Sequence, residues 1–269
     1  MSDILVLAAA MLATGAIGGV LAGLLGIGGG IVIVPVLDAA LGFLGVDAAI
    51  RMHIAVGTSL ATIIPTSISS SRAHHRRGAV DLDLVRRWAV FVMLGALLGA
   101  WIASRVHSDV LSVVFASFAF LIALKLLLPS DGKTLADEVP RHGLMSLIPT
   151  AIGTVSSMMG IGGGTLSVAT LTLLNQPIHR AVGTASLFGL AISLPGAIGF
   201  VVAGTGDPRL PFGSLGYVNL LGFALISPMT VWFAPLGAAI AHRLTQRRLS
   251  VLFGAFLLTM SARMAWQAM

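Results

Sequence analysis

The pentapeptide Gly26-Ile27-Gly28-Gly29-Gly30 interrupts a long apolar stretch near the start of the chain, and it recurs as Gly160-Ile161-Gly162-Gly163-Gly164. A second motif, His53-x-Ala55-Val56-Gly57-Thr58, recurs as His179-x-Ala181-Val182-Gly183-Thr184. Both pairs occur in the same order, which is the sequence signature of an internal repeat. The order predicts two related halves, 1–128 and 143–269, joined by a polar linker at 129–142.

The composition around these motifs indicates a membrane protein. Hydrophobic residues make up 57% of the 269 residues and charged residues only 10%, whereas a soluble domain carries about 25% charged residues. The outer surface must therefore face a lipid bilayer. At roughly 20 residues per span, the length allows about eight to ten membrane segments. We expect an all-α polytopic fold that binds no nucleic acid, no metal and no cofactor, and the lack of cysteine excludes thiol chemistry.

Apolar runs divide each half into five segments. They lie at 3–25, 31–44, 54–71, 88–104 and 109–128, and then at 143–160, 165–175, 181–203, 217–241 and 249–268. The second segment of each half is too short to span a bilayer, which favours half-helices or re-entrant pieces. Glycines spaced four apart, such as Gly95 and Gly99, predict close helix packing, and such glycine faces also permit a homodimer.

The basic residues predict that the second half is inverted. The loop after the third segment of the first half carries a basic cluster from Arg72 to Arg87, whereas the equivalent loop near Thr205–Gly216 carries only Arg209. The next loop reverses this bias, with Arg105 in the first half and Arg243, Arg247 and Arg248 in the second. Basic loops stay in the cytoplasm. Equivalent loops are therefore expected on opposite sides of the membrane, with both termini outside.

The two glycine clusters are the strongest candidates for a binding site. The dinucleotide fingerprint fails, because Ile31 and Thr165 stand where its last glycine is needed, and there is no P-loop. Consecutive glycines break a helix, and the next helix then begins with free N–H groups and a partial positive charge that suit an anion. Paired breaks in inverted repeats point to a central transport site. The predicted ligand groups are Gly28, Gly29, Gly30, Gly162, Gly163 and Gly164; the alternative is a tight helix hairpin that binds nothing.

Hydroxyl groups in the second motif are the next candidates. Thr58, Ser59, Thr184 and Ser186 begin long apolar segments in the two halves. Their hydroxyls can donate to the oxygens of a bound anion. They can equally cap a helix or bond to the carbonyls of their own helix.

Five ionisable residues are candidates for gating or proton coupling. His53 and His179 precede the Gly-Thr motifs, and a duplicated pair could bind an anion or move protons; the alternative is an interfacial position. Arg51 and Arg180 could attract an anion or extend to the membrane surface. Asp38 could carry a coupling proton, although the end of a half-helix in water is the favoured interpretation.

Taken together, these motifs resemble the TauE/SafE sulfite exporter family. The first half carries the resemblance through Gly28-Gly29-Gly30-x-x-x-Val34-Pro35-x-Leu37, Val56-Gly57-Thr58-Ser59 and Arg77-Gly78-Ala79-Val80-Asp81. The second half departs from the pattern, because Val168-Ala169-x-Leu171 lacks the proline and Ala185 interrupts the Thr-Ser pair. The resemblance implies transport of sulfite or an organosulfonate across the bacterial inner membrane.

Four classes of function remain to be compared. A secondary transporter fits the repeat and the broken segments, and an anion channel or a carrier of another small organic acid shares the same composition. An intramembrane enzyme needs a nucleophile beside a base, and no such motif is present, so no catalytic residue is predicted. A purely structural protein would not need duplicated helix breaks. We therefore expect alternating access of a small anion between the two halves.

Overall fold

The computed structural model describes residues 2–25, 29–128, 144–240 and 246–267, and within these ranges the regular structure is all helical apart from one hairpin of two two-residue strands. The predicted linker 129–142 and Gly28 lie outside the described residues. Ten helices occur in the described part. In the first half they are α1 (Ser2–Leu25), α2 (Gly30–Phe43), α3 (Ala48–His75), α4 (Leu82–Ala103) and α5 (Ser108–Leu127). In the second half they are α6 (Leu144–Met159), α7 (Gly164–Leu173), α8 (Ile178–Gly204), α9 (Leu220–Ile240) and α10 (Gln246–Gln267).

Five of these helices are long and apolar enough to cross a membrane: α3, α4, α5, α8 and α9. The short second segments of the two halves are confirmed as α2, with 14 residues, and α7, with 10 residues. Large apolar side chains also remain exposed on the outside of the bundle, including Trp232, Val202 and Leu221. An apolar exterior of this extent fits contact with lipid. The protein is therefore a multi-pass membrane protein.

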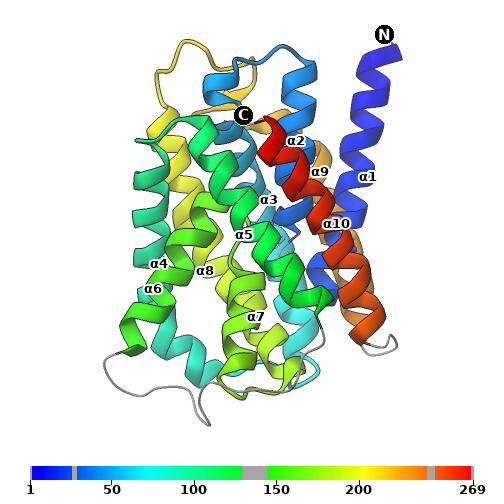
Figure 1. Cartoon of the computed structure of the whole chain (residues 1–269), viewed down its shortest axis with the longest axis vertical. Coiled ribbons are helices and arrows are strands. Elements are labelled where there is room, and N and C mark those ends of the chain that lie inside the picture. Colours follow the sequence, from blue (N-terminus) through cyan, green and yellow to red (C-terminus); the bar gives the residue numbers. More distant parts are fainter. Residues whose placement is uncertain (1, 26–28, 129–143, 241–245, 268–269) are drawn as a thin grey trace.

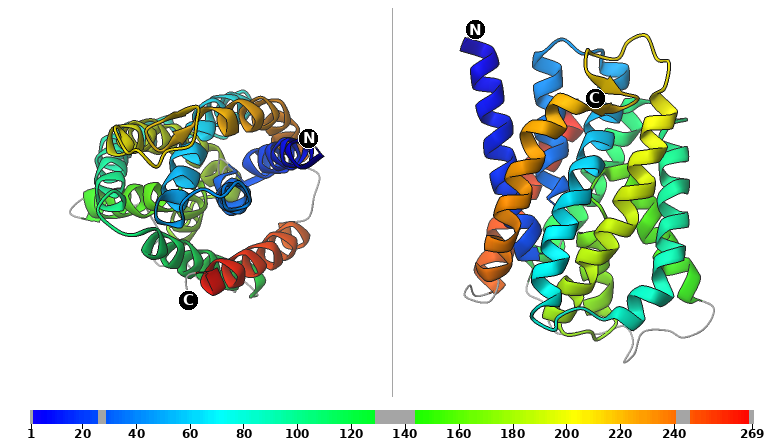
Figure 2. Two further views of the ribbon diagram at one scale, coloured as in Figure 1. Left: turned by 90° about the horizontal axis from the view of Figure 1, so that it is seen from above. Right: turned by 180° about the vertical axis from the view of Figure 1, so that it is seen from behind.

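The helices run back and forth along the long axis of the molecule. Figure 1 shows α1 leaving the end that carries both termini, whereas α6 starts at the opposite end. The α3–α4 connection and the α8–α9 connection likewise lie at opposite ends, as the reversed view in Figure 2 also shows. The basic cluster that starts at Arg72 therefore lies at the opposite end of the molecule from Arg209.

Helix starts were the least accurate part of the sequence prediction. The apolar runs placed the third and fourth segments at 54 and 88, but α3 begins at Ala48 and α4 at Leu82. In both cases a carboxylate ends the preceding loop: Asp47 accepts the Ala49 N–H, and Asp81 accepts the Leu84 N–H. These caps start the helix several residues before its apolar face begins.

A short hairpin precedes α9. Strands β1 (Ser214–Leu215) and β2 (Val218–Asn219) pair antiparallel, with Ser214 opposite Asn219. The hairpin ends at Asn219, whose side chain accepts the Gly222 N–H in the first turn of α9. The apolar run placed the start of this membrane segment at 217, but α9 begins only at Leu220, after the second strand.

Small residues bring α1 against α9 and α4 against α6, as their four-residue spacing predicted. A Cβ added at Gly19 would lie 2.7 Å from the Thr230 carbonyl oxygen, and one at Gly23 would overlap the Ala234 carbonyl oxygen. On the other pair, Cβ atoms at Gly95 and Gly99 would overlap the carbonyl oxygens of Thr150 and Thr154 of α6. Helix backbones can approach this closely only where side chains are absent.

We predict that Gly19→Ala destabilises the protein by about 1–3 kcal/mol, because the added methyl group meets backbone atoms of α9 that cannot rotate away. The control is Gly18→Ala in the same helix, where the nearest atom to a new Cβ is 3.5 Å away. Thermal unfolding of the two variants in detergent is the measurement. Equal melting temperatures would contradict the packing of α1 on α9.

Candidate functional site

In both glycine clusters the residue before the last is left-handed and caps the start of a short helix. Gly29, the N-cap of α2, has φ 75° and ψ −8°, and Gly163, the N-cap of α7, has φ 72° and ψ −5°. Only glycine adopts this conformation without strain. Neither helix has a side-chain cap, so the first N–H groups of both helices are available to another acceptor.

The two breaks meet inside the protein. A Cβ at Gly30 would overlap the Gly160 carbonyl oxygen and would lie 2.9 Å from Ile161 Cα. The hydroxyl of Ser59 donates to the same Gly160 carbonyl at 2.7 Å. The tip of the α1–α2 hairpin therefore packs directly on the tip of the α6–α7 hairpin, with α3 beside both.

Thr58 and Thr184 make matching contacts across the two halves. Thr58 Oγ1 accepts the Asn219 N–H at 2.8 Å, and Thr184 Oγ1 accepts the Asp81 N–H at 2.9 Å. Asn219 and Asp81 stand at the starts of α9 and α4, and each caps its own helix. Each threonine thus holds the start of a helix from the other half.

The glycines of the same motifs allow these contacts. A Cβ at Gly57 would lie 2.5 Å from the Tyr217 carbonyl oxygen, and one at Gly183 would overlap the Ala79 carbonyl oxygen. Tyr217 and Ala79 each stand two residues before the amide that the threonine accepts. The Val-Gly-Thr motif therefore docks a helix start, a role that the sequence analysis did not assign to it.

We expect Thr58→Val and Thr184→Val each to destabilise the protein by about 1–3 kcal/mol, because each leaves a buried N–H without an acceptor. Thr→Ser at the same positions keeps the hydroxyl and is expected to restore most of the stability. Thermal unfolding of the four variants tests this. A serine variant as unstable as the valine variant would show that packing, and not the hydrogen bond, is what Thr58 and Thr184 provide.

The remaining predicted ligand residues, Gly162, Gly164 and Ser186, are all buried but in different settings. Ser186 is buried, and its hydroxyl donates to the Gly183 carbonyl of its own helix at 2.6 Å. A Cβ at Gly162 would lie 2.8 Å from Ile63 Cγ2, so this glycine packs against α3. Gly164 is the first residue of α7 and is buried.

The candidate ionisable residues are paired with groups of the protein. Asp38 is 3% exposed, inside α2, and its Oδ1 accepts from Arg51 Nε at 2.9 Å. The interpretation of Asp38 as a helix end in water is therefore wrong, because α2 continues to Phe43. Arg180 is half exposed and pairs with Asp81 Oδ2 at 3.1 Å.

The two histidines occupy different environments in spite of their matching sequence positions. His53 is buried; its Nε2 lies 3.0 Å from the Ala103 carbonyl and 3.1 Å from the Val106 carbonyl, so it donates across the α4–α5 turn. His179 is exposed in the first turn of α8. The difference arises because α3 starts ten residues before Thr58 and α8 only six before Thr184. His53 therefore lies well inside its helix.

A charged cluster covers His53 from the α8–α9 connection. The Tyr217 ring packs on the His53 ring with centroids 5.2 Å apart, and Tyr217 Oη donates to Asp207 Oδ2 at 3.2 Å. Arg209 Nη2 donates to the same carboxylate at 2.7 Å. These hydrogen bonds from Arg209 hold the pKa of Asp207 well below its usual value, whereas burial raises the pKa of Tyr217. The cluster fastens the connection to the start of α3.

A group of buried polar side chains was missed by the sequence analysis. Seven buried side chains in the described part have no hydrogen-bond partner, and each of them can donate a hydrogen bond. They are Ser67, Ser70, Trp88, Ser156, Ser157, Thr165 and Ser167. A buried polar group without a partner is unfavourable unless a water or a ligand supplies one. Four of the seven flank the second glycine break.

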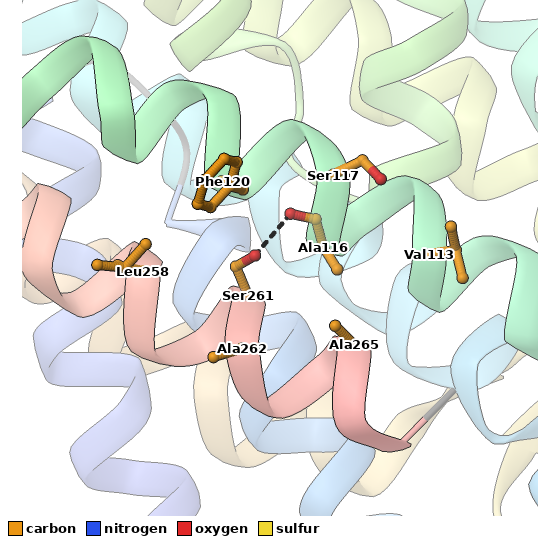
Figure 3. A pocket seen from close by; sticks show the side chains of 8 residues that line it. All are labelled: Val113, Ala116, Ser117, Phe120, Leu258, Ser261, Ala262 and Ala265. Atoms are coloured by element: carbon orange, nitrogen blue, oxygen red, sulfur yellow. Dashed lines mark hydrogen bonds between the residues drawn. The ribbon is translucent and has the colours of Figure 1, made fainter. Parts of the chain in front are cut away.

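A separate hollow of about 510 Å³ lies between α5 and α10 (Figure 3). Its lining is mainly apolar, and the Ser261 hydroxyl within it already donates to the Ala116 carbonyl at 2.8 Å. Val113 and Phe120 of this lining are exposed on the outside of the bundle. The hollow therefore faces lipid and is no candidate for the site of an anion.

Broken helices that meet inside a multi-pass helical bundle are typical of secondary transporters. A model of the family described as sulfite exporter TauE/SafE matches residues 11–264. The chain belongs to this family, as its motifs indicated, and it is a membrane transporter and not an enzyme.

Relatives from distant organisms cover nearly the whole chain. A probable membrane transporter protein of Haemophilus influenzae is 34% identical over 94% of this chain and 96% of its own length. A probable membrane transporter protein of Bacillus subtilis is 27% identical over 94% and 95%. One from Methanocaldococcus jannaschii is 23% identical over 95% and 94%. No solved structure matches the chain.

Proposed function

We propose that this protein is a secondary transporter that moves a small anion, sulfite or an organosulfonate, across the bacterial inner membrane. Transport proceeds by alternating access between two inverted repeats, 1–128 and 143–269. The family supports the substrate class, and the contact between Gly30 and the Gly160 carbonyl carries the assignment of the site, because it places two helix breaks together at the junction of the halves.

The matched contacts of the two halves support the inverted repeat. Thr58 and Thr184 accept equivalent helix-start amides from opposite halves, and Gly57 and Gly183 make room for equivalent carbonyls. The contact of α1 with α9 has its counterpart in the contact of α6 with α4. A twofold axis in the plane of the membrane would relate these contacts, as in other transporters built from inverted repeats.

The helix breaks support binding of an anion. α2 and α7 both begin where the two tips meet, without a side-chain cap, and the N-terminus of a helix carries about half an elementary positive charge. Rocking of one half against the other would expose this junction to one side of the membrane at a time. The tight glycine contacts between α1 and α9 and between α4 and α6 would keep each of these pairs rigid during the movement.

Proton coupling is the further part of the proposal. Asp38 and His53 are the buried candidates, and Asp38 is paired with Arg51 across the α2–α3 contact. Because this ion pair joins α2 to α3, a change at Asp38 would alter how the two helices are held together. Asp38→Asn is therefore expected to uncouple anion flux from a pH gradient.

Flux of sulfite into proteoliposomes containing the purified protein tests the function. A carrier shows counterflow: unlabelled sulfite inside the vesicles accelerates the uptake of labelled sulfite from outside. A channel shows flux without counterflow, and a carrier of another organic acid shows counterflow with that acid alone. Absence of flux with sulfite, sulfonates and small carboxylates would contradict the proposal.

A further inference from the structure

We infer that the two helix breaks are not equivalent and that the anion binds at the second break alone, held by the hydroxyls of Ser67, Ser156 and Ser167 and by the N-terminus of α7. This inference rests on the proposed function and names the residues of its site. The first break then serves as an apolar packing surface.

The unpartnered donors carry the inference. Ser156, Ser157 and Ser167 are fully buried and Thr165 is 7% exposed, yet none of these hydroxyls has a hydrogen-bond partner within the described chain. Ser156 and Ser157 stand in the last turn of α6, and the other two stand in the first turn of α7. All four therefore flank the break at Gly160–Gly163.

The positions that a Cβ atom would take on nearby glycines show that the hydroxyls of Ser156 and Ser67 both lie close to this break. Ser156 Oγ lies 3.3 Å from the position of a Cβ at Gly163, the residue that caps α7. Ser67 Oγ, from α3, lies 2.6 Å from the Cβ position at Gly189 of α8, and the Gly162 carbonyl lies 3.5 Å from the same point. Donors from α3 and α6 thus lie at this turn, beside the side chain of Ile192, and Ser167 stands in the first turn of the helix that follows it.

The first break has apolar residues in the corresponding places. Matched on the glycine clusters, Ala22 and Gly23 stand for Ser156 and Ser157, and Ile31 and Ile33 stand for Thr165 and Ser167. Both isoleucines are fully buried, and a Cβ at Gly18 would touch the Ile33 side chain at 3.5 Å. The repeat has therefore kept the backbone of the break in both halves but the hydroxyls in only one.

The chemistry of the site favours an anion with one negative charge. The polar groups that these contacts bring together are hydroxyls and helix N–H groups, next to the apolar side chains of Ile63 and Ile192, and none of these residues is ionisable. The N-terminus of α7 carries about half an elementary positive charge, which compensates a larger share of one negative charge than of two. A dianion such as sulfate would therefore keep more uncompensated charge in a buried site, which is strongly unfavourable. Methanesulfonate, with three acceptor oxygens and one charge, matches the donors.

Binding to the purified full-length protein tests the inference, with methanesulfonate and sulfate as probes in isothermal titration calorimetry at neutral pH. Each lost hydrogen bond to an anion is expected to weaken binding by about tenfold to a hundredfold. Ser156→Ala and Ser67→Ala should both show this loss for methanesulfonate. The control is Ser193→Ala: Ser193 stands at the position of Ser67 in the other half, is fully buried and donates to the Leu190 carbonyl of its own helix. The affinity of the Ser193→Ala protein for methanesulfonate should equal that of the wild-type protein.

The outcomes separate this inference from the proposed function. Wild-type binding that survives in both Ser156→Ala and Ser67→Ala, with unchanged affinity, would overturn the second-break site and leave the anion transporter intact. Equal affinity for sulfate and methanesulfonate would overturn the single-charge preference. A wild-type protein that binds neither probe and gives no flux with any anion would instead contradict the proposed function. Thermal unfolding of each variant shows whether it is folded, and Ser167→Ala, which removes another of the three proposed hydroxyls, replaces Ser156→Ala if the latter does not fold.

Discussion

Gly30→Ala is expected to abolish transport and to lower the melting temperature by more than Gly19→Ala. The new methyl group would overlap the Gly160 carbonyl oxygen and meet Ile161 Cα at 2.9 Å, and both are backbone atoms. Overpacking of a close-packed interior costs about 1–3 kcal/mol when side chains can adjust. Here two helix tips must separate instead, so the loss is expected to reach or exceed the upper end of that range.

Sulfite counterflow and thermal unfolding of the same preparation are the two measurements. Gly18→Ala, already described as open to a methyl group, controls for a glycine-to-alanine change in the same α1–α2 hairpin. Gly160→Ala approaches the same junction from the other side, because its Cβ would lie 2.9 Å from Val34 Cγ2 and 3.0 Å from Val56 Cα. A Gly30→Ala protein that transports at the wild-type rate would show that the tips do not meet in the functional protein.

Arg51→Met is expected to destabilise the protein by about 3–5 kcal/mol, because it leaves the Asp38 carboxylate buried without its cation. The carboxylate side chain is 5% exposed, and Arg51 Nε is its partner at 2.9 Å. Methionine retains much of the volume of the arginine chain, so the loss reports on the charge and its hydrogen bond. Denaturant-induced unfolding in detergent is the measurement.

The double variant Asp38→Leu with Arg51→Met is the control for this prediction. Replacing both members of a buried ion pair with apolar groups is often close to neutral. The double variant should therefore be more stable than Arg51→Met alone. If the effects of the two single changes simply add in the double variant, the residues do not interact, and the ion pair has no part in holding α2 to α3.

Much of the fold followed from the spacing of apolar runs and glycines. The ten apolar segments correspond in order to the ten described helices, and the short second segment of each half became α2 and α7. Membrane-spanning helices are predictable in this way because lipid demands a long apolar run for each of them. The helix starts at Ala48 and Leu82 were missed because Asp47 and Asp81 cap turns that carry charged side chains.

The candidate site was predictable in its backbone and not in its side chains. Consecutive glycines favour a helix break, so the sequence alone predicted that short helices begin at Gly29 and Gly163. Thr58 and Thr184 were read as ligands, but their partners Asn219 and Asp81 are more than a hundred residues away in sequence, and no local pattern reveals such a contact. Ser67 and Ser156 gave no signal, since a serine in an apolar segment most often bonds to its own helix.

The exchange of helix starts between the halves has a consequence for biogenesis. The Asp81 N–H donates to Thr184, which is 103 residues later in the chain. Thr58 accepts the Asn219 N–H, which is 161 residues later. A ribosome delivers the chain from its N-terminus, so the first five helices enter the bilayer before their partners have been made. At that stage the Asp81 N–H between α3 and α4 has no acceptor, and Gly30 has no α6–α7 hairpin to pack against. The two halves therefore cannot complete their folding separately. The protein reaches its native structure only after α8 and α9 have been inserted.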